Sequence, residues 1–174
     1  MPLYTSAVHG CALQLQDPLY VRNGPNAPLS TQQQPVAALR RLGWGTEVHG
    51  NRWPAWLHFP LSLESIGPLT VRAVQVRFST RGGGILTAVH LWDGHERIAF
   101  NDRVDVPPLV SSGGNTIRQE ARAFLYTERP ATPPVINRRA AGISALWKFA
   151  TAIEGDVLSA VTFHEAGLLY DAAT

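Results

Sequence analysis

Turn-forming residues divide this chain into short apolar segments from one end to the other. The 174 residues include 15 glycines and 13 prolines, which are spread over the whole length. Glycine and proline interrupt helices and favour turns, whereas short apolar segments between them are typical of β-strands. The distribution therefore predicts an all-β chain built from short strands.

The clearest strand pattern lies at residues 71–80, where apolar and polar residues alternate. Val74, Val76 and Phe78 fall on one face of such a strand and polar residues on the other, because successive side chains point to opposite faces. Residues 85–93 follow after a run of three glycines and also have the composition of a strand. We predict that the two segments pair as a β-hairpin.

A second pair of strands is predicted near the C-terminus. Residues 143–149 alternate in the same way, and 157–163 follow after Glu154-Gly155-Asp156, whose residue types favour a turn. Weaker strand patterns occupy six more segments, namely 3–8, 11–16, 43–49, 55–59, 97–101 and 121–127.

Two further segments leave their local structure open. Residues 36–42 suit a short helix entered through Pro35, and 165–171 suit either a last turn or a strand. About nine or ten strands in all is a number typical of two packed sheets. The prediction is an all-β, single-domain β-sandwich of jelly-roll type that covers residues 1–174.

Composition excludes several other classes of protein. Hydrophobic residues make up 45% of the chain and charged residues 16%, whereas disordered proteins have low hydrophobicity and high charge. No apolar run approaches the roughly 18–20 residues of a membrane-spanning helix. The net charge is +2 and the cations are scattered, so neither a membrane nor a nucleic acid is expected as partner. The N-terminus lacks the features of a secretory signal, which predicts a cytoplasmic protein.

Cysteine and histidine spacing gives no support for a bound metal. Cys11 is the only cysteine, which excludes an internal disulfide and a thiolate cluster. His90, Asp93 and His95 lie close in sequence, but their spacing matches no common metal motif. The Asp-Gly pair that follows Trp92 is typical of a turn instead. We expect neither a metal nor another cofactor.

Several short motifs together resemble a family of small all-β actinobacterial proteins whose function is not known. In chain order the matching pieces are His9-Gly10, Leu13–Gln16, Gly43–Thr46, Trp56–Pro60, Val89–Gly94, Gly142–Ser144 and Phe163–Gly167. The shared pattern reads HG, GWGT, WxHFP and VHxWDG. The resemblance implies a β-sandwich, and it supplies no catalytic or binding residues.

Two predicted strands carry large side chains on both faces. In residues 55–59 the face opposite Leu57 holds Trp56 and His58, and in the later strand the face opposite Leu91 holds His90 and Trp92. A strand with one face in water normally alternates apolar and polar residues. Something is therefore expected to cover or occupy this second face.

The two segments also mirror each other in sequence, as Trp56-x-His58 and His90-x-Trp92. If they paired directly as antiparallel strands, Trp would face Trp and His would face His, with Cβ atoms about 4.5–5.5 Å apart. This hypothesis competes with the hairpin between 71–80 and 85–93.

A face of aromatic rings and imidazoles suits a ligand with a flat apolar side and a polar rim, such as a sugar or a polycyclic molecule. The predicted ligand-binding residues are Trp44, Trp56, His58, His90 and Trp92. The alternative interpretation is that these rings only pack under a loop or against another subunit.

Three functions remain open from the sequence. The first is a non-catalytic or self-assembling module that binds a small molecule, a glycan, a protein partner or further copies of itself. The second is a cofactor-independent enzyme, of cyclase or isomerase type, with His58 or His90 as acid and base, because a histidine pKa near 6.5 serves proton transfer at neutral pH. The third is a purely structural subunit of a larger assembly.

Overall fold

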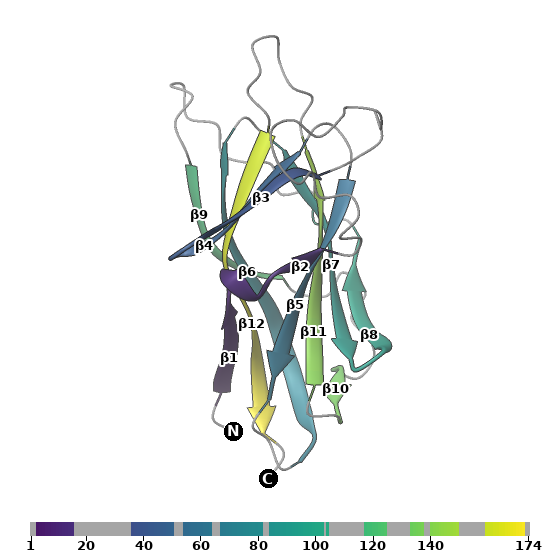
Figure 1. Cartoon of the computed structure of the whole chain (residues 1–174). Helices are drawn as coiled ribbons and strands as arrows, with labels where there is room; N and C mark the ends of the chain where they lie inside the picture. The colour runs from purple at the N-terminus through teal and green to yellow at the C-terminus, as the bar shows by residue number, and fades with distance from the viewer. Residues whose placement is uncertain are drawn as a thin grey trace.

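Two antiparallel β-sheets pack face to face in the computed structural model of this chain (Figure 1). The structure describes residues 3–15, 36–50, 54–63, 67–81, 84–102, 104, 117–124, 133–137, 140–149 and 159–172. The predicted β-sandwich is therefore confirmed, with twelve strands in the described residues. No helix in these ranges has the length and apolar character needed to span a membrane.

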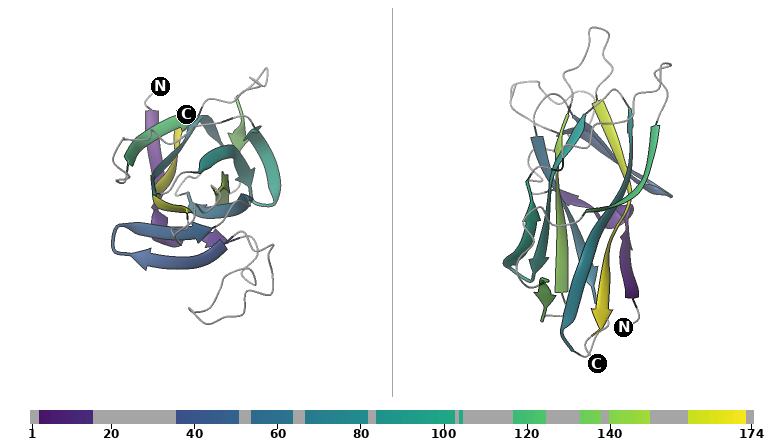
Figure 2. Two further views of the ribbon diagram at one scale, coloured as in Figure 1. Left: turned by 90° about the horizontal axis from the view of Figure 1, so that it is seen from above. Right: turned by 180° about the vertical axis from the view of Figure 1, so that it is seen from behind.

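The first sheet has seven strands. Its main path runs β10 (Val135–Ile136), β6 (Leu69–Arg81), β12 (Ser159–Ala172), β4 (Gly45–Gly50) and β3 (Val36–Leu42), and β1 (Leu3–His9) pairs with β12 while β9 (Ile117–Phe124) pairs with β6. Because Leu3 pairs with Asp171, the two ends of the described chain lie side by side at one end of the sandwich (Figures 1 and 2).

The second sheet has five strands. Their order is β2 (Gln14–Leu15), β5 (Pro54–Ser62), β11 (Ala140–Lys148), β7 (Ile85–Asp93) and β8 (Glu96–Asn101). A single 3-10 turn, η1 (Gly10–Ala12), joins β1 of the first sheet to β2 of the second. The long strand β11 lies at the centre of this sheet, between β5 and β7.

The space between the sheets is filled by aliphatic and aromatic side chains. Four rings meet near its centre: Phe59 and Trp147 come from the five-stranded sheet, and Phe78 and Phe163 come from the seven-stranded sheet. All four are at most 1% exposed, and their centroids lie 5.3 to 6.3 Å apart in edge-on or tilted pairs, which aromatic quadrupoles favour.

Gly84 belongs to this packing because it lies against the edge of the Trp147 indole. Its φ is 125°, and an added Cβ would come within 2.7 Å of the indole Nε1. Both the backbone conformation and the space therefore require glycine at this position.

Both predicted pairings between strands adjacent in sequence are wrong, although the strands themselves are present. β6 and β7 lie in different sheets, and so do β11 and β12; the Glu154–Asp156 segment lies outside the described residues. Alternation shows which face of a strand is buried, but two strands that face the same core from opposite sheets show the same alternation. Their pairing partners are therefore not contained in that pattern.

The short helix expected at 36–42 is also wrong. This segment is strand β3, which forms an antiparallel ladder with β4 from Val36–Gly50 to Leu42–Gly45. Alanine, leucine and arginine are good helix formers, but helix propensity amounts to less than about 1 kcal/mol per residue, and cross-strand pairing overrides it here. Residues 165–171, left open by the sequence, belong to strand β12.

Candidate functional site

Strand β11 brings the two predicted histidines together by lying between their strands. Ser144 of β11 pairs with His58 of β5 on one side and with His90 of β7 on the other. The expected direct pairing of β5 with β7 is therefore wrong, and the two strands run parallel to each other. His58, Ser144 and His90 form one row across the sheet, and Trp92 and Gly142 lie in the next row.

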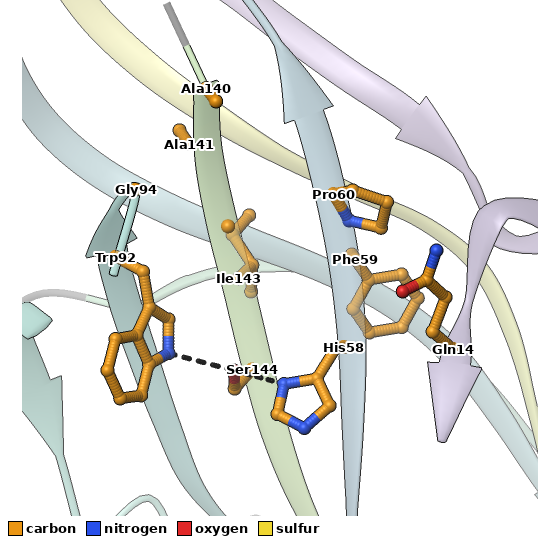
Figure 3. Close-up of a pocket in the computed structure, with 11 residues that line it drawn as sticks. Gln14, His58, Phe59, Pro60, Trp92, Gly94, Ala140, Ala141, Ile143 and Ser144 are labelled. Carbon is orange, nitrogen blue, oxygen red and sulfur yellow. Dashed lines mark hydrogen bonds between the residues drawn. The ribbon is translucent and has the colours of Figure 1, made fainter. Parts of the chain in front are cut away.

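Ser144 holds the rings of both neighbouring strands. The Trp92 indole Nε1 donates to its Oγ at 2.8 Å, and the same Oγ lies 2.6 Å from Nδ1 of His58 (Figure 3). Small side chains on β11 make this geometry attainable, because the larger rings can lean over the central strand from both sides. Ser144 itself is only 2% exposed.

Chemistry fixes the direction of the Trp92 bond, whereas that of the His58 bond depends on the histidine tautomer. The indole can only donate, which makes Ser144 Oγ an acceptor from Trp92. Burial, and then the charge of neighbouring His90, lower the pKa of His58 from 6.5, so the imidazole is neutral at pH 7. The Ser144 hydroxyl donates to Nδ1 in the tautomer that carries its proton on Nε2, and Oγ accepts with its second lone pair in the tautomer that carries it on Nδ1.

His90 is enclosed by aromatic rings and bound to a carboxylate. Its centroid lies 4.5 Å from that of Trp56 and 6.3 Å from those of Trp92 and Phe100. Its Nε2 lies 2.6 Å from Oδ1 of Asp102, which follows directly after β8. The side chain of His90 is 7% exposed and that of Asp102 55%.

A shallow groove of about 340 Å³ opens on this face, beside the Ser144 network (Figure 3). Gly142 forms part of its floor, and the cross-strand neighbours of that glycine, Trp92 and Pro60, stand on either side. The described residues that line it are Gln14, His58, Phe59, Pro60, Trp92, Gly94, Ala140, Ala141, Gly142, Ile143 and Ser144.

Four of the five residues predicted to bind a ligand gather on this outer face: Trp56, His58, His90 and Trp92. Trp44 does not join them. It lies between β3 and β4 of the other sheet, with 56% of its surface exposed. Its indole stacks on His164 with centroids 5.2 Å apart, and His164 Nε2 lies 3.0 Å from Ser79 Oγ.

Sequence reasoning missed the residues of β11 and β8 that complete the face. Gly142 and Ser144 alternate with Ile143 and Ala145, and these small residues were the available signal, whereas the position of their strand between β5 and β7 was not. The contact of Asp102 with His90 had no such signal, because it depends on the path of the chain directly after β8.

The predicted turn after Trp92 is confirmed as the link between β7 and β8, with Gly94 at a φ of 63°. Asp93 points into the protein, where its Oδ2 accepts the backbone N–H of Asn137 at 3.0 Å. It therefore lies on the opposite face of the strand from His90. Across the described ranges, no group of three or more His, Cys, Asp or Glu side chains could hold a metal ion.

Comparison with known proteins places the chain in no family. No family model and no curated protein matches the sequence. Among solved structures, the chain is similar to the enzymatically active domain of tailspike protein 4 of bacteriophage CBA120, with 12% identity and a TM-score of 0.39. The match covers 96% of this chain but only 19% of the tailspike chain.

Proposed function

We propose that this protein is a non-catalytic binding module, which binds a small molecule or a glycan in the groove over Gly142. The observation that carries the proposal is the hydrogen-bonded group of Trp92, Ser144 and His58 beside that groove. Sites for small molecules combine an apolar, concave surface with a few fixed polar groups, and this groove has both.

The fixed rings favour binding because their side chains lose little conformational entropy when a ligand binds. A side chain that is immobilised on binding costs about 0.5–1.5 kcal/mol. Trp92 and His58 are both half-buried and already held by one buried serine. The wall of the groove is therefore organised before any ligand arrives.

The position of Ser144 argues against a role as nucleophile. The side chain is almost fully buried, and its Oγ already accepts a hydrogen bond from Trp92 and contacts His58. A nucleophilic oxygen must reach the reacting atom of a substrate. Ser144 is instead suited to positioning its two neighbours.

Substitution of Ser144 tests the proposal. Ser144→Ala keeps the shape of the groove but releases both rings, so we expect weaker binding by about three- to tenfold. The probes are 2-naphthol and neutral hexasaccharides, followed through the indole N–H resonance of Trp92. Ser6→Ala, in β1 of the opposite sheet, is the matched control. Unchanged affinity in Ser144→Ala, or a Trp92 resonance that no probe moves, would contradict the proposal.

A second candidate is acid–base catalysis by His58 on a bound apolar molecule. The lowered pKa of His58 supports it, because a neutral imidazole is a competent base at pH 7. Exchange of carbon-bound hydrogen for deuterium in the bound probes, measured by NMR in D2O, tests this chemistry. Exchange that disappears in His58→Gln would favour the enzyme over the binding module.

A further inference from the structure

Gly142 differs from the other strand glycines with described surroundings because its missing side chain is not required by the fold. A Cβ on Gly45 would come within 2.4 Å of a backbone oxygen, and one on Gly167 within 2.7 Å. A Cβ on Gly142 would meet nothing closer than Trp92 Cβ at 3.7 Å, an ordinary contact, and its φ is not positive. The space above Gly142 is therefore kept open without a packing or backbone reason.

The described lining of the groove over this glycine is uncharged. None of its residues is Asp, Glu, Lys or Arg, and the lowered pKa of His58 keeps that side chain neutral at pH 7. An ionic group placed there would lose water and gain no opposite charge from these residues, which is costly. His90 is not among the lining residues, and its Nε2 is hydrogen-bonded to Asp102. The lining thus selects against charged ligands.

The groove is also shallow and open, so a ligand bound in it keeps one side exposed to water. A purely apolar molecule gains most from a site that buries 70–90% of its surface. A ligand that keeps one side in water needs polar groups on that side and an apolar patch on the other. The side-chain amide of Gln14 and Nε2 of His58 supply polar contacts at the edge.

We propose that the occupant of this groove is a ring of an uncharged saccharide, with its apolar face against the Trp92 indole over Gly142 and its hydroxyls toward His58, Gln14 and water. The groove volume of about 340 Å³ is at the lower end for small-molecule sites. It suits a short stretch of a saccharide chain. This inference rests on the proposed binding function and names the class of its ligand.

NMR titration of the full chain tests the ligand class. The five tryptophans give separate indole N–H resonances, and the one lost in Trp92→Phe identifies Trp92. The probes are maltohexaose, cellohexaose and fully N-acetylated chitohexaose, all of them neutral. The hexasaccharide that binds is then compared with its C6-carboxylate form. We expect at least one neutral hexasaccharide to move the Trp92 resonance saturably, and its carboxylate form to bind at least about tenfold more weakly.

Two outcomes separate this inference from the proposed function. If 2-naphthol moves the Trp92 resonance and no saccharide does, or if the carboxylate form binds as well as the neutral one, the saccharide inference is overturned while the binding function stands. If neither kind of probe moves it, both are overturned. A response to the free monosaccharide as strong as to the hexasaccharide would identify a single-ring site.

Filling the floor of the groove is the second arm of the test. Gly142→Leu places a side chain where the sugar ring is proposed to lie, so the affinity is expected to fall at least about tenfold. Gly67→Leu is the matched control, because nothing lies within 4 Å of an added Cβ there. Gly142→Ala, whose Cβ fits, should show a smaller loss even if the leucine variant fails to fold. Full affinity in both Gly142 variants would exclude the groove as the saccharide site.

Discussion

The outer faces of the two sheets differ in chemistry although both come from alternating strands. On the seven-stranded sheet, Asp171 accepts hydrogen bonds from the guanidinium of Arg72 at 2.5 and 2.6 Å, and Arg77 lies 3.8 Å from Glu165. On the five-stranded sheet the same positions of the alternation hold tryptophan, histidine, serine and glycine.

The difference indicates which face has a function to perform. Ion pairs on a solvated sheet face satisfy themselves and need no partner. Aromatic rings on an outer face keep apolar surface near water, and a glycine in a central strand lowers stability. Exposed rings occur on the seven-stranded sheet too, at Tyr4 and Trp44. Among the described strand glycines with given surroundings, however, packing does not require Gly142 of the five-stranded sheet, whereas it does require Gly45 and Gly167. A face that joins such a glycine to aromatic rings is the better candidate for binding, because functional sites commonly reduce stability.

The largest predicted effect comes from removing one ring of the aromatic face. Trp92→Ala is expected to lower the free energy of unfolding by about 2 kcal/mol, less than for a fully buried tryptophan because Trp92 is half-buried. Urea denaturation measures the change. Glu165→Ala, which removes the long ion pair on the other face, should cost less than about 0.5 kcal/mol. Equal losses at both positions would show that the two faces do not differ in energetic terms.

The sequence was sufficient to predict that this aromatic face exists, but not how its residues are arranged. Trp56 and His58, and likewise His90 and Trp92, could be assigned to one side of their strands because side chains alternate along a strand. Their relative position depends on β11, which inserts between the two strands from a distant part of the chain. Pairing between remote strands is a property of the folded topology, and no local pattern encodes it.

The same limit explains the position of Trp44. The tryptophan lies between two strands whose pairing with each other is local, but their place in the seven-stranded sheet is set by β12. Stacking on His164 follows from that long-range contact. Residue type alone therefore grouped Trp44 with four side chains of the opposite sheet.

An intermediate effect of opposite sign is predicted at the groove floor. Gly142→Ala should raise the free energy of unfolding by about 0.5–1 kcal/mol, because alanine restricts the unfolded chain and suits a strand better than glycine, and because its Cβ fits at 3.7 Å from Trp92. Thermal or urea denaturation measures the gain. Gly167→Ala, where the Cβ would meet a backbone oxygen at 2.7 Å, should destabilise. A loss of stability in Gly142→Ala would mean that the fold requires this glycine after all.

The smallest effect is the pH dependence that His58 gives to the aromatic face. Burial and the charge of His90 lower its pKa in the folded state, whereas the unfolded chain keeps a value near 6.5. As the pH falls through 6.5, the unfolded state takes up the proton first, so the free energy of unfolding decreases until the pH passes below the folded-state pKa. Around His58 lie Ser144, His90 with its hydrogen-bond partner Asp102, and Gln14 from β2.

Urea denaturation at pH 8, 7, 6 and 5 measures this contribution as a difference between variants. His58→Gln should lose less stability than the original protein between pH 7 and 5 and should show no added difference between pH 8 and 7, where both states are neutral. His95→Gln, exposed in the turn between β7 and β8 of the same sheet, is the control and should follow the original protein. A steeper acid loss in His58→Gln would mean that the folded state favours the charged imidazole, whose Nδ1–H would then donate to Ser144 Oγ.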